Sequence, residues 1–138
     1  MAKNAICLDT GMMTLLYSKD TPQSIINLFK QIKEEKIEAH ILSPLITEAF
    51  YHICRLSGKV AAETIIATFL NTYPIKLVNL NQSIIFKAGL LKCQHPHIVS
   101  YNDCFAIAYA LNKKLIFYTT EKIFGEIFPT LKLKTFSF

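Results

Sequence analysis

Short apolar runs alternate with longer amphipathic segments along this chain. Four short runs are rich in apolar and β-branched residues and predict strands, at 5–8, 39–42, 74–80 and 115–118. The segments between them carry apolar residues at helical spacing, at 25–32, 45–57, 60–69, 81–92 and 105–111. The tail at 132–138 alternates with period two, as in an edge strand with one wet face. This order predicts an α/β fold, a three-layer α/β/α sandwich around a mainly parallel sheet of about five strands.

Local signals predict where several helices begin. Thr21-Pro22 and Ser43-Pro44 each place a hydroxyl at a cap position and a proline at the first helical residue. Ser100 with Asp103 three residues later is similar to a capping box, although the box prefers Glu or Gln. The run 119–121 is expected to cap a short helix that ends near Pro129.

The length and composition indicate one domain over residues 1–138. The chain is 51% hydrophobic, which is enough for one sizeable core and too little length for two. No apolar run approaches a membrane span, no secretory h-region is visible, and the four cysteines form no CxxC pair. These features favour a soluble cytoplasmic protein without a membrane partner.

The formal net charge is +5 and comes almost entirely from lysine, since Arg55 is the only arginine. A basic domain often binds a polyanion such as RNA. Lysine-rich surfaces also occur for solubility alone, so charge leaves both interpretations open.

Four carboxylates, those of Asp9, Glu48, Asp103 and Glu121, lie where an apolar run gives way to the start of a helix. Parallel strands bind ligands at their carboxyl ends, so these acids are expected to converge there. One such acid can simply stabilise a helix dipole, by roughly 0.3–1 kcal/mol. Several together raise one another's pKa values unless a cation neutralises them. An all-oxygen set fits Mg²⁺ or Mn²⁺ better than zinc.

The ordered motifs resemble those of the PIN-domain nucleases over nearly the whole chain. The motifs are an apolar strand ending in Asp9-Thr10, Ser43-Pro44-x-x-x-Glu48, Ser100-x-x-Asp103-x-x-x-Ala-x-Ala110, and a strand followed by Thr119-Thr120-Glu121. The resemblance implies a metal-dependent ribonuclease that hydrolyses RNA phosphodiester bonds. By the same resemblance Asp9, Glu48 and Asp103 are the principal acids, and Glu121 takes a place where aspartate is commoner.

Further expectations concern the residues around these acids. Thr10 and Thr120 would orient metal ligands or waters, or would act only as helix caps. Arg55, Lys59 and Lys122 are candidates for RNA phosphate contacts, or are ordinary solvated side chains.

A small PIN domain with nothing appended most resembles the VapC-type toxins, which implies a VapB-like antitoxin and a homodimer. Two alternatives stay open: a PIN-like module that binds RNA or protein with little or no catalysis, and a small factor in RNA processing or quality control. A zinc cluster at Cys93, His95 and His97 is a weaker hypothesis, because the spacing matches no common finger. Neither GxGxxG nor GxxxxGK[ST] occurs, which disfavours dinucleotide-binding and P-loop sites.

Overall fold

The computed structural model describes residues 4–137 and contains a five-stranded sheet with the order β3-β2-β1-β4-β5. Every neighbouring pair of strands is parallel. In the register, Ile6 of β1 lies level with Ala39 of β2 and Ile116 of β4. The strands are β1 (Asn4–Leu8), β2 (Ile37–Leu42), β3 (Lys76–Val78), β4 (Ile116–Thr119) and β5 (Leu133–Thr135).

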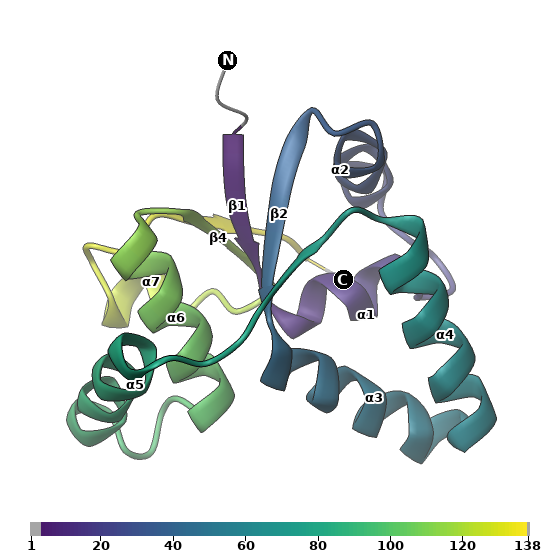
Figure 1. The fold of residues 1–138 in the computed structure, drawn as a ribbon. Helices are drawn as coiled ribbons and strands as arrows, with labels where there is room; N and C mark the ends of the chain where they lie inside the picture. The colour runs from purple at the N-terminus through teal and green to yellow at the C-terminus, as the bar shows by residue number, and fades with distance from the viewer. Residues whose placement is uncertain (1–3, 138) are drawn as a thin grey trace.

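Helices cover both faces of this sheet, with α1 to α4 on one side and α5 to α7 on the other (Figure 1). The predicted three-layer α/β/α sandwich is therefore confirmed. Within residues 4–137 no helix is both long and apolar enough to cross a bilayer. The helices are α1 (Thr10–Leu16), α2 (Gln23–Lys33), α3 (Ser43–Ser57), α4 (Lys59–Thr72), α5 (Gln82–Gln94), α6 (Tyr101–Lys113) and α7 (Phe124–Ile127).

The central strand is apolar because helices pack on both of its faces. Ile6, Cys7 and Leu8 are all buried, as expected for a strand inside a parallel sheet. On α2 the buried residues include Ile25 and Phe29, which recur at helical spacing, and Phe29 makes an edge contact with Phe69 of α4 at 6.1 Å between ring centroids. Each large apolar side chain buried in this way contributes about 1.5–3 kcal/mol.

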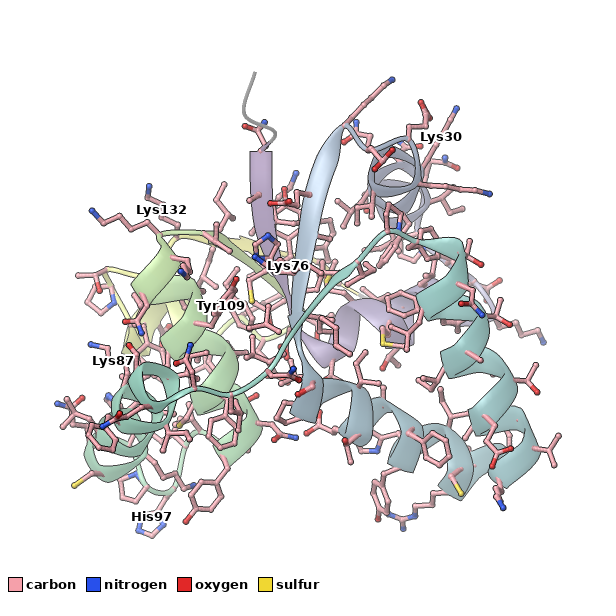
Figure 2. All side chains as sticks on the ribbon, in the orientation of Figure 1. Lys30, Lys76, Lys87, His97, Tyr109 and Lys132 are labelled. Carbon is pink, nitrogen blue, oxygen red and sulfur yellow. The ribbon has the colours of Figure 1, made fainter. Side chains whose placement is uncertain are left out.

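A buried polar pair joins α6 to β2. The hydroxyl of Tyr109 lies 2.6 Å from Nδ1 of His40, and Nε2 of that imidazole lies 2.9 Å from a carboxylate oxygen of Glu38. Figure 2 shows Tyr109 directed from α6 toward the strands. Both rings of the pair are buried, so the hydrogen bond satisfies groups that would otherwise be costly to take out of water.

Of the helix starts predicted at 21–22, 43–44 and 100, one is confirmed and two are wrong. Ser100 caps α6 in a reciprocal capping box with Asp103. At α2, however, Pro22 occupies the cap position, and the hydroxyl of Thr21 donates to the carbonyls of residues 16 and 18. At α3, Leu42 is the cap and Ser43 is already helical. Nearby backbone carbonyls compete for Thr21, and β2 runs directly into α3, which leaves no loop residue to act as the cap.

The chain also departs from prediction beside the acids. Helix α1, which the apolar pattern does not predict, begins at Thr10, and the short helix expected directly after 119–121 begins only at Phe124, with no side-chain cap. Strands β3 and β5 pair over three residues each, fewer than the predicted runs at 74–80 and 132–138, and Phe138 lies outside the described residues. Both are edge strands with one neighbour, and at its C-terminal end each pairing stops where that neighbour stops, at Leu42 of β2 and Thr119 of β4.

Candidate active site

Asp9 directly follows β1 and forms the N-cap of α1. One carboxylate oxygen accepts from the backbone N–H of Thr10 at 2.8 Å, and the other accepts from the hydroxyl of Thr119 at 2.6 Å. The backbone N–H of Asp9 donates to the carbonyl of Tyr118 at 2.9 Å. Because the side chain is only 6% exposed, strands β1 and β4 hold this carboxylate in one orientation.

Glu48 and Asp103 are both oriented by the start of α6. The Nδ2 of Asn102 donates to a carboxylate oxygen of Glu48 at 3.1 Å and to the carbonyl of Pro44 at 3.4 Å. Asp103 accepts from the backbone N–H of Ser100 at 3.0 Å within the capping box. The first turn of α6 therefore supports two acids, one on its own chain segment and one on α3.

Glu121 lies in the loop after β4, and its side chain is exposed. Its backbone N–H donates to the hydroxyl oxygen of Thr119 at 3.0 Å, so Thr119 bonds both Asp9 and the Glu121 loop. Thr120 packs on α1 at Gly11, where an added Cβ would come within 2.5 Å of the threonine hydroxyl oxygen. Only glycine at position 11 allows the loop to approach this closely.

All four predicted acids line one cavity of about 220 Å³ at the carboxyl edge of the sheet. Thr10 also lines it, and its hydroxyl is buried without a hydrogen-bond partner in the described part of the chain. Thr14 and His52 lie on the boundary, since they line both this cavity and a more apolar one of about 290 Å³ between α1, α3 and α4. The complete lining is Asp9, Thr10, Gly11, Thr14, Glu48, His52, Asp103, Thr120 and Glu121.

Burial raises the pKa of Asp9 from its ordinary value of 3.8 to about 6. The negative charges of Asp103 and Glu48 contribute to this rise, the hydrogen bonds from Thr119 and Thr10 act in the opposite direction, and the value of about 6 is the net result. Asp103 and Glu48 therefore both lie close enough to Asp9 to disfavour its negative charge. A cation in the cavity would relieve that repulsion and hold Asp9 in its ionised form.

The donor chemistry of the cavity suits a divalent cation that prefers oxygen. Its walls offer carboxylates and the unpartnered Thr10 hydroxyl, with His52 at the rim. As the side chains stand, however, no three His, Cys, Asp or Glu residues among 4–137 are gathered as a metal-binding group. The acids are held instead by Thr119, Asn102 and Ser100. Their assignment as metal ligands therefore stays a prediction.

The basic residues proposed for RNA lie outside this cavity's lining. Arg55, in the last turn of α3, lies 3.5 Å from the hydroxyl of Tyr51, and Lys59 pairs with Glu63 at 3.7 Å on α4. Lys122 is exposed next to Glu121. Other lysines, such as Lys30, Lys87 and Lys132, extend from separate parts of the periphery (Figure 2). His95, one of the residues of the weaker zinc hypothesis, packs its ring against Phe128.

Sequence reasoning missed three residues of the site: Thr119, Asn102 and His52. The sequence predicts Thr119 as part of a helix cap and Thr120 as a supporting hydroxyl, but the register of β1 with β4 places Thr119 beside Asp9. That register is not visible in the sequence. Asn102 immediately precedes Asp103, and an amide next to a candidate acid was the one signal available.

A known family model matches most of the chain. The sequence profile described as PIN domain matches residues 6–127. The chain belongs to the PIN domain family. No curated protein matches this PIN domain chain by sequence.

The fold of this PIN domain is shared with solved toxin–antitoxin structures. VapBC2 from Rickettsia felis, solved bound to a DNA fragment from its promoter, is similar with a TM-score of 0.78 and 18% identity, covering 96% of this chain and 99% of that chain. VapC20 from Mycobacterium tuberculosis, described as a sarcin-ricin loop cleaving toxin, gives a TM-score of 0.72 and 16% identity over 89% and 95% of the two chains. DNA-bound VapBC from Salmonella typhimurium gives 0.72 and 15% over 97% and 98%.

Proposed function

We propose that this PIN domain protein is a Mg²⁺- or Mn²⁺-dependent endoribonuclease and the toxin of a toxin–antitoxin pair. The observation that carries the proposal is the convergence of Asp9, Glu48, Asp103 and Glu121 on one cavity, with the pKa of Asp9 raised to about 6. A buried acid beside two like charges is a costly arrangement, which is typical of functional sites. The similarity to a toxin described as cleaving the sarcin-ricin loop supports RNA as the substrate.

In this proposal the four acids hold the cation, directly or through water. The bound cation would activate a water for attack on phosphorus and stabilise charge on the leaving oxygen. Thr119 fixes the orientation of Asp9, and Asn102 fixes that of Glu48. The buried Thr10 hydroxyl has no hydrogen-bond partner among the described residues. Arg55, Lys59 and Lys122 are proposed to contact RNA phosphates beyond the cavity.

A VapB-like antitoxin is the proposed protein partner. The apolar cavity of about 290 Å³ shares Thr14 and His52 with the acidic cavity, so a peptide lying along both would cover the acids. A homodimer is part of the same proposal. Exposed apolar side chains on α5, such as Phe86 at 69% and Leu90 at 51%, supply surface for a second copy.

Cleavage of single-stranded RNA by purified protein tests the enzyme. Wild-type protein is expected to require added Mn²⁺ or Mg²⁺, and Asp9→Asn and Asp103→Asn are each expected to lose about 100-fold or more in rate. Asp20→Asn, which removes an exposed carboxylate outside the cavity, is the matched control and should cleave like wild type.

Two outcomes would redirect the assignment. Equal cleavage by wild type and both variants would mean that the acids are not catalytic. Undiminished RNA affinity without any metal-stimulated cleavage would favour the binding module instead. The partner is tested separately: co-expression with a short reading frame adjacent in the genome should suppress growth arrest caused by this chain.

A further inference from the structure

A third cavity, of about 260 Å³, lies between α2 and the strands β4 and β5. Three polar residues of α2, Ser24, Asn27 and Gln31, recur at helical spacing along one wall. The opposite wall carries the aromatic rings of Tyr118 and Phe136 together with Lys134, and Leu28 and Ile37 complete the lining. The walls thus combine aromatic, amide, hydroxyl and ammonium groups, and no lining residue is a carboxylate.

The aromatic wall is formed by two largely buried rings, of which Tyr118 is 8% and Phe136 9% exposed. The rings of Tyr118 and Phe136 have centroids 5.5 Å apart and an interplanar angle of 37°. The ammonium of Lys134 lies 5.6 and 5.7 Å from the two centroids, within the range of a cation–π contact. Lys134 is exposed and pairs with Tyr118 across the β4–β5 register, so its charge is held at the mouth of the cavity.

The amide wall presents free donors. The side-chain amide of Gln23 donates to Oδ1 of Asn27 at 2.9 Å, one helical turn along α2, and so orients the Asn27 amide. Among residues 4–137 the NH₂ group of Asn27 has no partner of its own. Asparagine and glutamine side chains are well matched to the donor and acceptor edges of nucleobases.

Consecutive residues of β4 take part in this cavity and in the acidic site. The carbonyl of Tyr118 accepts from the backbone N–H of Asp9, and the next residue, Thr119, bonds the Asp9 carboxylate. The backbone N–H of Phe136 donates to the carbonyl of Thr119 at 2.9 Å. Tyr118, whose ring lines this cavity, is the residue of β4 directly before Thr119, and the two cavities have no lining residue in common.

We propose that this cavity binds a nucleobase of the RNA substrate, next to the nucleotide that is cut, and so sets base preference. The inference rests on the proposed ribonuclease function. Unpaired bases are recognised by aromatic contact and by hydrogen bonds to their edges, with lysine on the neighbouring phosphate. Here the aromatic pair, the α2 amides and Lys134 supply these three contacts.

Two substitutions at the rim test the proposal without disturbing the core. Lys134→Ala should raise KM for single-stranded RNA about tenfold with little change in kcat, because the lost contact is made equally before and during cleavage. Asn27→Leu should relax base preference at one position beside the cut in a randomised oligonucleotide pool. Lys132→Ala, which removes an exposed lysine at the same edge but outside the lining, is the matched control.

Binding measured apart from cleavage separates this inference from the nuclease assignment. In amide NMR spectra of wild-type protein, the four nucleoside 5′-monophosphates should shift the signals of Asn27, Gln31 and Lys134 saturably and to different extents. No shift at these residues, or equal KM and base preference for Lys134→Ala and Lys132→Ala, would overturn the proposal.

Two mixed outcomes are also decisive. Mononucleotide binding with unchanged RNA selection would assign the cavity to a free nucleotide and overturn its substrate role. A protein that cleaves nothing, yet binds RNA more weakly as Lys134→Ala than as Lys132→Ala, would support the base pocket while the nuclease assignment fails.

Discussion

Replacing Asp9 with asparagine should stabilise the metal-free protein at neutral pH. Asp9 is buried, and burial together with the charges of Asp103 and Glu48 raises its pKa to about 6. Above that pH the folded protein must keep an ionised carboxylate in an unfavourable place. Asparagine has nearly the same shape, accepts the bond from the Thr10 N–H with its oxygen, and carries no charge.

The magnitude follows from the displacement of the pKa. A shift from 3.8 to about 6 corresponds to about 3 kcal/mol of penalty on the ionised form. Between these two values the folded state binds the proton more tightly than the unfolded state, so stability falls as the pH rises through this window. The penalty is absent below about pH 3.8 and complete above about pH 6. Loss of the charge-assisted bond from Thr119 offsets part of the gain, so we expect Asp9→Asn to be about 1–3 kcal/mol more stable at pH 7.5.

Urea unfolding of wild type and Asp9→Asn from pH 4 to pH 8, in chelator, measures this difference. The gap in free energy of unfolding should be small at pH 4 and should grow to its plateau above pH 6. Asp20→Asn serves as the control and should show no such pH-dependent gap. Saturating Mn²⁺ should then stabilise wild type by about 2.7 kcal/mol at 100 times its Kd and Asp9→Asn by less. A variant that is no more stable than wild type at pH 7.5, or a gap that is constant with pH, would refute the reasoning.

Two further substitutions probe how the site and the core are packed. Gly11→Ala should lower the free energy of unfolding by about 1–3 kcal/mol, because the added Cβ would meet the Thr120 hydroxyl oxygen at 2.5 Å. Gly89→Ala, which has open space around a helical position, should raise it by about 0.5–1 kcal/mol. Thermal unfolding of both variants checks the pair, and equal effects would contradict the close approach at position 11. Tyr109→Phe should lose about 1–3 kcal/mol by leaving Nδ1 of buried His40 unpaired, measured by urea unfolding, and an unchanged midpoint would show that this hydrogen bond adds nothing to stability.

The sequence determined the order of the strands and of the helices other than α1, and the approximate bounds of β1, β2 and β4. Apolar runs such as 5–8 must be buried on both faces, and helix periodicity is a local property, so both can be read along the chain. The capping box of Ser100 and Asp103 was readable for the same reason, because its partners are three residues apart. In the same way, the sequence placed four acids where the chain passes from strand to helix.

Only the tertiary structure decided which groups support those acids. Thr119 bonds Asp9 across 110 residues, and Asn102 bonds Glu48 across 54, so each contact depends on strand register and helix packing rather than on local pattern. Thr120 lines the same cavity, so its supporting role stays a prediction, while the register of β1 with β4 places Thr119 beside Asp9. The charge penalty on Asp9 is likewise a property of the assembled sheet edge, because burial and the approach of Asp103 and Glu48 exist only once the chain has folded.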